Sequence, residues 1–162
     1  MIRAATLADA PAVAAIYAPE VLHGTASFET VPPTGPDMAA RMAKVQDAGW
    51  PWLVAETGNG IAGYAYASQF RDRPAYRHTC ENSVYVAAGA RGCGTGRALL
   101  EALVDAARAA GFRQMIAVIS DSGNAASIGL HRACGFRDAG RLEAVGLKFG
   151  RWLDVVTMQR AI

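Results

Sequence analysis

Hydrophobic positions along the chain fall into two periods, which predict a regular succession of strands and helices. Short apolar or alternating runs predict strands at 2–5, 52–56, 61–68, 79–87, 113–120, 136–143 and 152–160. Apolar positions three or four residues apart predict helices at 7–18, 36–47, 97–110 and 124–134. This order of elements predicts a mixed α/β sheet with helices on both faces.

Local signals sharpen the ends of several of these elements. Thr6 followed by Asp9 is typical of a helix start, and Pro19 is expected to end or kink the helix that follows. Gly58-Asn59-Gly60 predicts a hairpin turn between two strands. The run Met115–Ile119 is almost entirely apolar, which fits a strand covered on both faces.

Composition limits the classes of protein that the chain can represent. Its 162 residues without a linker or repeat indicate a single domain over residues 1–162. A net charge of +2 with scattered arginines argues against nucleic acid as a partner. No apolar segment is long enough to span a membrane, and the first residues do not resemble a signal peptide. Three cysteines without a CxxC pair favour free thiols in the cytoplasm and no metal site.

The stretch 81–100 carries the clearest chemical signal. A strand leads into a loop with glycines at 92, 94 and 96, and an amphipathic helix follows. Backbone N–H groups and the dipole at such a helix start attract phosphate, and glycine allows close approach. The loop lacks the GxxxxGK[ST] pattern, and Arg97 stands where a dinucleotide fingerprint needs its last glycine. By itself the loop therefore fits either a phosphate site or a plain turn.

The wider pattern resembles the GCN5-related N-acetyltransferases (GNAT superfamily). The run Arg91–Gly96 matches their R/Q-x-x-G-x-G/A pyrophosphate loop, and Asn124 to Phe136 is similar to their second motif. The resemblance covers essentially the whole chain. It implies an α/β (α+β) fold with a mixed, mostly antiparallel sheet flanked by helices on both faces, and acetyl-CoA as co-substrate.

Four further segments resemble the phosphinothricin and methionine sulfoximine acetyltransferase branch. They are Phe28-Glu29, Arg71–Tyr76, Glu81–Val86 and Lys148–Val155. The resemblance implies direct transfer of acetyl to the α-amine of a small amino-acid analogue. It also implies a homodimer in which the 146–152 loop lies near the partner's cleft. Herbicide-detoxifying members carry arginine where Glu29 stands, which favours methionine sulfoximine or sulfone over phosphinothricin as the substrate.

Two residues are candidates for proton transfer. Glu81 is the expected general base, because an α-amine is mostly ammonium at neutral pH; its other interpretation is a solvated glutamate at a strand end. His131 occupies the position where many members have a tyrosine that protonates the leaving thiolate, so it is either that acid or an ordinary helix residue.

The resemblance also assigns binding residues. The expected cofactor-binding residues are Val84, Tyr85, Val86, Arg91, Gly92, Cys93, Gly94, Thr95, Gly96, Arg97, Asn124 and Ser127, with a backbone N–H near Val86 facing the thioester oxygen. The expected substrate-binding residues are Phe28, Glu29, Arg71, Arg73, Tyr76 and Thr79. For Val84 and Val86 the side chains are expected to pack in the core while the backbone binds.

Other functions remain compatible with the sequence. The same scaffold could acetylate protein N-termini or another metabolite amine, or serve as a non-catalytic acetyl-CoA sensor. A nicotinamide oxidoreductase is disfavoured by the glycine spacing of the loop.

Overall fold

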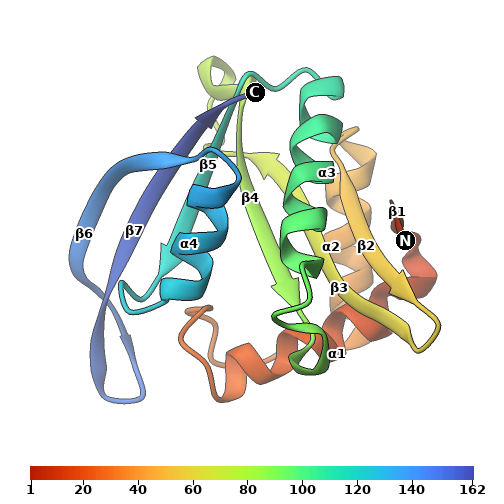
Figure 1. Cartoon of the computed structure of the whole chain (residues 1–162), viewed down its shortest axis with the longest axis horizontal. Helices are drawn as coiled ribbons and strands as arrows, with labels where there is room; N and C mark the ends of the chain where they lie inside the picture. The colour runs from red at the N-terminus through yellow and green to blue at the C-terminus, as the bar shows by residue number, and fades with distance from the viewer.

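Seven strands form one sheet in the order β1-β2-β3-β4-β5-β7-β6 (Figure 1). The computed structural model describes all residues, 1–162. The strands are β1 (Ile2–Ala4), β2 (Trp52–Thr57), β3 (Gly60–Gln69), β4 (Thr79–Val86), β5 (Gln114–Ser120), β6 (Arg137–Lys148) and β7 (Arg151–Ala161). Every pairing is antiparallel except that of β4 with β5. The predicted mixed, mostly antiparallel sheet is therefore confirmed.

Helices cover both faces of this sheet, as the sequence predicts. They are α1 (Ala10–Leu22), α2 (Gly35–Asp47), α3 (Thr95–Ala109) and α4 (Ala125–Ala133), with short 3-10 turns at Leu7–Asp9, Pro74–Tyr76 and Ala88–Ala90. In Figure 1, α3 and α4 lie in front of the sheet, whereas α2 lies behind it and α1 runs along the lower edge.

The pleat of β3 separates two hydrophobic cores. Ala65 and Ala67 face α3 and belong to one buried cluster, while Tyr64 lies in the second cluster with α1 and α2. Successive side chains of a strand point to opposite faces, so small residues receive α3 and aromatic residues receive α1 and α2. The α3 stripe at 99, 100, 103, 104 and 107 is fully buried, as its period predicts.

The first helix is longer than the sequence predicts. Pro19 lies inside α1, and the helix continues to Leu22 instead of ending at 18. A proline costs one helical hydrogen bond, but packing compensates here: Val21 in the last turn is buried, and the carbonyl of Glu20 accepts a bond from Lys148. Tertiary contacts thus hold a turn that the local sequence disfavours.

The C-terminal loop is also different from its prediction. The strand expected at 136–143 extends to Lys148, and the segment 146–152 is a hairpin whose turn consists of Phe149 and Gly150, both with positive φ. Most of β6 is exposed, so its sequence lacks the apolar alternation that marks a half-buried strand. Long pairing with β7 maintains the strand, although the register shifts twice, between Asp138 and Gly140 and between Leu142 and Gly146.

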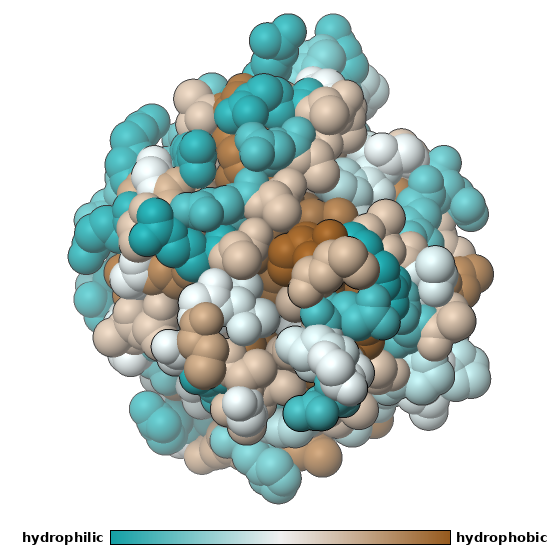
Figure 2. Space-filling model, turned by 45° about the vertical axis from the view of Figure 1, so that its right-hand side comes forward, coloured by the Kyte–Doolittle hydropathy of each residue, from teal (hydrophilic) through white to brown (hydrophobic).

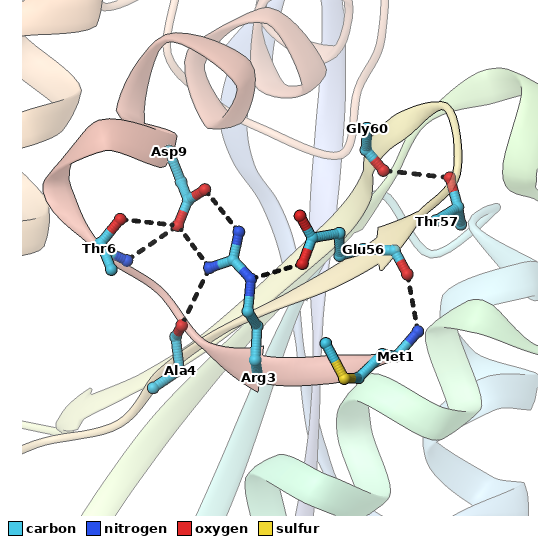
Figure 3. A network of polar contacts seen from close by, with 8 residues as sticks. All are labelled: Met1, Arg3, Ala4, Thr6, Asp9, Glu56, Thr57 and Gly60. Atoms are coloured by element: carbon cyan, nitrogen blue, oxygen red, sulfur yellow. Dashed lines mark hydrogen bonds and ion pairs between the residues drawn. The ribbon is translucent and has the colours of Figure 1, made fainter.

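A polar network fixes the N-terminal edge of the sheet (Figure 3). Arg3 on β1 donates to both carboxylate oxygens of Asp9 at 2.8 Å and to Glu56 on β2 at 2.7 Å. Asp9 also accepts from the backbone of Thr6, which is the capping arrangement expected from the sequence. The hydrogen bond from Arg3 lowers the pKa of Asp9 to about 2.

The surface mixes polar and apolar groups, with the strongest apolar colour of Figure 2 in a recess near the middle of that view. The β6–β7 hairpin carries five exposed large apolar side chains: Leu142, Val145, Leu147, Phe149 and Trp152. None of the helices has both the length and the apolar character needed to cross a membrane.

Candidate active site

The parallel pairing of β4 with β5 covers only the first half of β4. It runs from Thr79 opposite Gln114 to Asn82 opposite Ala117, and then the strands separate. A cleft of about 440 Å³ occupies the space between the second half of β4, the end of β5 and the starts of α3 and α4. The cleft thus exists because two adjacent strands stop pairing at Asn82.

The backbone of β4 faces this cleft at alternate residues. The N–H of Ala87 donates to Ala62 on β3, so the pleat turns the polar groups of Val84 and Val86 away from β3, toward the opening. The two valine side chains pack against the α3 core, as predicted. Tyr85 lines the cleft, but its ring also packs on Tyr64 at 5.3 Å.

The glycine loop closes one end of the cleft, at the start of the 15-residue helix α3. Gly92 and Gly94 have φ of 75° and 82°, and a Cβ at either would meet no atom within 4 Å. A Cβ on Gly96 would lie 3.4 Å from Leu130 of α4, so this glycine allows two helices to approach. Positive φ, open space and a helix N-terminus together make a cradle that fits a phosphate.

The other predicted loop residues take different positions. The Arg91 guanidinium donates to the carbonyl of Val86 at 3.1 Å and pairs with Glu20 of α1 at 2.5 Å. Arg97 lines the cleft but pairs along its own helix with Glu101. Cys93 in the loop and Thr95 at the start of α3 do not line the cleft, and Cys93 is exposed.

Helix α4 supplies the opposite wall. Asn124 caps it by accepting from the N–H of Ser127 at 3.2 Å, and both residues line the cleft. One turn further along, His131 is buried in the cleft wall, with 4% of its surface exposed. Its Nδ1 lies 2.8 Å from the Ser127 carbonyl, and its Nε2 lies 2.9 Å from Oδ1 of Asn82. Burial lowers the pKa of His131, while the bond to Ser127 opposes that shift.

Glu81 lies on the other face of the sheet. It precedes Asn82 on β4, so its side chain points toward the α1 and α2 side while Asn82 points toward α4. The structure therefore places Glu81 and His131 on opposite faces, beside the rung where the split begins. Burial raises the pKa of the Glu81 carboxyl, and the nearby positive charge of Arg71 partly offsets this.

The predicted arginine pair lies in the connector between β3 and β4. The guanidinium of Arg71 stacks over the ring of Phe70 at 4.4 Å, and Tyr76 packs edge-on against the same ring. The Gln69 amide organises the connector by donating to the carbonyls of Arg71 and Arg73. Neither arginine pairs with a carboxylate of the chain, so both are available to a ligand. Thr79 begins β4 on the same face as Glu81.

Phe28 and Glu29 lie in the loop after α1 and are not among the residues that line this cleft. Both oxygens of Glu29 accept from Arg41 of α2, at 2.7 and 3.1 Å, and the Tyr17 hydroxyl adds a third bond at 3.0 Å. The bonds from Arg41 lower the pKa of Glu29. The Phe28 ring packs against Gly146, where a Cβ would lie only 2.4 Å from it.

Sequence reasoning missed three residues that shape the site. Asn82 joins β4 to α4, Arg41 neutralises Glu29, and the buried Lys148 donates to the carbonyls of Glu20 and Ser27. For Asn82 a signal existed, because asparagine is disfavoured in the middle of a buried strand. Lys148 opens the Lys148–Val155 segment of the resemblance, but that match does not indicate its partners Glu20 and Ser27. For Arg41 the sequence gave no signal.

The split sheet has a glycine cradle at one end and a half-buried carboxylate at the split, an arrangement that suits an extended, phosphate-bearing cofactor beside a proton acceptor. A family model described as "Acetyltransferase (GNAT) domain" matches residues 2–157. The chain belongs to this family, which confirms the resemblance found in the sequence.

Named relatives are consistent with that assignment. The chain is 56% identical over 154 residues to phosphinothricin N-acetyltransferase of Alcaligenes faecalis, covering 95% of this chain and 78% of that protein. It is 46% identical to the L-methionine sulfoximine/L-methionine sulfone acetyltransferase of Pseudomonas aeruginosa, covering 98% and 92%. A phosphinothricin acetyltransferase from Sinorhizobium meliloti, solved in complex with AcCoA, matches with a TM-score of 0.96 and 47% identity, covering 100% of this chain and 88% of that one. The predicted N-acetyltransferase class is thereby confirmed.

Proposed function

We propose that this chain transfers acetyl from acetyl-CoA directly to the α-amine of a small amino-acid analogue of the methionine sulfoximine, methionine sulfone or phosphinothricin type. One observation carries the proposal: the split between β4 and β5 opens beside Glu81 and continues to the glycine cradle at α3. The named relatives support the choice of substrate class.

The residues around the cleft fit acetyl-CoA. The cradle at Gly92–Arg97 suits the pyrophosphate through its backbone N–H groups and the start of α3. The guanidinium groups of Arg91 and Arg97 line the same cleft, each paired with a glutamate. The open backbone edge at Val84 and Val86 suits the amides of the pantetheine arm, and Asn124 and Ser127 face that edge from α4. Bound there, acetyl-CoA supplies an activated acyl group, and the Val86 N–H would stabilise charge on its carbonyl oxygen.

Glu81 is the proposed general base. A carboxylate whose pKa is raised by burial is a better proton acceptor near neutral pH than an exposed one, and the positive charge of Arg71 limits that rise. Because Glu81 and the α4 wall lie on opposite faces, the amine would approach from the Glu81 side. The thiol would then leave on the side of His131, which is the proposed acid that protonates it.

Arg71 and Arg73 are the proposed carboxylate clamp, since both guanidinium groups lack an acidic partner within the chain. Thr79 and Tyr76 border the same connector and would complete this pocket. Phe28 and Glu29 would contribute from the α1–α2 loop. Because Arg41 already neutralises Glu29, this pair presents little net charge to a substrate side chain, which fits a neutral sulfoximine or sulfone tip better than an anionic phosphinate.

The proposed assembly is a homodimer through the β6–β7 hairpin. The hairpin has five exposed large apolar side chains, and such a concentration on one element marks interfaces: Leu142, Val145, Leu147, Phe149 and Trp152. Three free cysteines, two of them buried, support the cytoplasm as the compartment in which the enzyme works.

A substrate panel tests the proposal. Thiol release from acetyl-CoA is measured with methionine sulfoximine, methionine sulfone, phosphinothricin and peptides with free N-termini. The proposal expects release with the amino-acid analogues. Release with peptides alone would indicate an N-terminal acetyltransferase, and CoA binding without any release would indicate a sensor.

A Glu81→Gln variant tests the base. It should lower kcat about 10²-fold or more while leaving the Kd for acetyl-CoA unchanged, since a positioned acid or base contributes roughly that much. Glu56→Gln removes a carboxylate on β2 far from the cleft and serves as the control. Equal turnover of the two variants at every pH would remove Glu81 from the mechanism.

A further inference from the structure

Asn82 is one of only four buried polar or charged side chains, and it contacts another of them, His131. It occupies the last rung at which β4 pairs with β5. Its Nδ2 donates to the carbonyl of Ile116 on β5 at 3.2 Å, and its Oδ1 lies 2.9 Å from Nε2 of His131. One amide therefore connects the end of the strand ladder to helix α4 at the cleft wall.

The partners of the amide determine its orientation. The Ile116 carbonyl only accepts hydrogen bonds, so the NH₂ group of Asn82 must face it. The opposite orientation would set two carbonyl oxygens against each other. Asn82 thus presents an acceptor to His131, and Nε2 must carry a proton to bond with it.

The second ring nitrogen, Nδ1, also needs a proton to bond with its partner. Nδ1 of His131 lies 2.8 Å from the Ser127 carbonyl, which is also a pure acceptor. A neutral imidazole has a single N–H and leaves one of these two contacts without a proton, whereas the imidazolium satisfies both. The carbonyl oxygen of Ser127 and Oδ1 of Asn82 thus favour the imidazolium, which can act as an acid.

We propose that Asn82 is a positioning residue for His131, holding the ring against the cleft wall with a proton on Nε2. The inference rests on the proposed function, in which His131 is the acid. When the C–S bond breaks, the electron pair stays on sulfur. The Nε2–H bond, whose proton was until then donated to Oδ1 of Asn82, breaks, and an S–H bond forms. The ring becomes neutral, and its Nδ1 keeps the proton that it donates to the Ser127 carbonyl.

No charged side chain near His131 takes over the role proposed for the Asn82 amide. The ring edge of Phe136 packs at 5.0 Å, and no charged side chain contributes to the shift in the pKa of His131. Burial lowers that pKa and the bond to the Ser127 carbonyl opposes the shift. The other ring nitrogen, Nε2, faces a second neutral acceptor, Oδ1 of Asn82, at 2.9 Å. Substitutions of Asn82 should therefore have a direct effect on the titration of His131.

The test follows the ¹⁵N resonances of the imidazoles with pH in the full-length protein. The chain has three histidines, and a His131→Gln variant assigns the relevant signal. Asn82→Asp should raise the pKa of His131 by about one unit or more, since it places a carboxylate beside the ring. Asn82→Ala should lower it. Cys80→Ala, on the same face of β4 and without a polar contact to His131, should leave it unchanged.

Kinetics provide the second readout. Asn82→Ala should lower kcat roughly tenfold with little change in KM for acetyl-CoA. Asn82→Asp should move the alkaline limb of the kcat profile upward together with the pKa of the ring. An unchanged His131 titration in both folded variants would overturn the proposal, and if Asn82→Ala does not fold, the near-isosteric Asp variant decides alone.

Separate measurements test the acid role of His131 and its contact with Asn82. If His131→Gln turns over like the wild type, the acid role belonging to the proposed function is wrong. The dependence of the His131 resonance on Asn82 is measured without substrate, so it supports or refutes the positioning contact whatever the activity of the enzyme.

Discussion

Replacing Gly94 by alanine tests the glycine cradle in a way that separates folding from binding. Gly94 has φ of 82° and lies just before α3, with no atom within 4 Å of its Cβ position. Alanine in this left-handed conformation costs about 1–2 kcal/mol. For a chain of this size that corresponds to a loss of roughly 2–8 °C in Tm.

Gly49 provides a matched control. It has φ of 77°, follows α2, and likewise has no atom within 4 Å of its Cβ position, but it lies outside the cleft. Gly49→Ala should therefore lower Tm by a similar amount. Only Gly94→Ala should impair cofactor binding, because its methyl group enters the space that the cradle leaves for phosphate.

The expected loss of affinity corresponds to one hydrogen bond between the backbone of the cradle and the phosphate. One hydrogen bond to a charged group contributes about 1.5–3 kcal/mol, which is roughly a ten- to hundred-fold change in Kd. Isothermal titration with CoA measures it, and differential scanning calorimetry measures Tm. Wild-type CoA affinity in a destabilised Gly94→Ala variant would refute the cradle, and equal losses of affinity in both variants would attribute the effect to general strain.

Three further predictions concern other parts of the molecule. Arg71→Gln should move the acid limb of the kcat/KM profile to higher pH. Arg71 lowers the pKa of Glu81, so its removal lets that pKa rise, and the carboxylate forms only at higher pH. An unshifted limb would show that Arg71 does not influence the titration of Glu81. Lys148→Met, similar in volume, should lower the free energy of unfolding by about 2 kcal/mol in urea, since the part-buried carbonyl of Glu20 and the buried carbonyl of Ser27 lose their donor; an unchanged midpoint would contradict this. Trp152→Asp should convert the proposed dimer to monomer in sedimentation velocity while Leu7→Asp, exposed outside the hairpin, should not; identical behaviour of the two variants would exclude the hairpin as the interface.

The parts of the fold that could be predicted from the sequence are the segments with a regular spacing of apolar residues. The α3 stripe and the apolar centre of β5 are buried as expected because burial on a fixed face imposes a fixed spacing. Pro19 and the β6–β7 hairpin differ from their predictions for separate reasons: a distant residue stabilises the turn at Pro19, whereas β6 is mostly exposed and so lacks the apolar alternation that marks a strand. Local sequence disfavours a helical Pro19, but Lys148, more than a hundred residues away, stabilises that turn.

In the candidate site, too, features set by the local sequence could be predicted, whereas contacts between distant segments could not. The glycines at 92 and 94 could be assigned from sequence, because a left-handed turn at a helix start requires that residue type. The contact between Asn82 and His131 depends on where α4 lies against the split sheet, which no local pattern encodes. Likewise, nothing near Glu29 indicates that Arg41 neutralises it.

The most direct test of the central claim follows the acetyl group itself. The enzyme is incubated with acetyl-CoA labelled with ¹³C in the acetyl group and with methionine sulfoximine, and product and protein are examined by NMR and mass spectrometry. Direct transfer predicts label on the α-nitrogen, one free thiol per product, and no acetylated protein at any time. Label on the protein before it reaches the amine, or no label on any amino-acid analogue, would contradict the account.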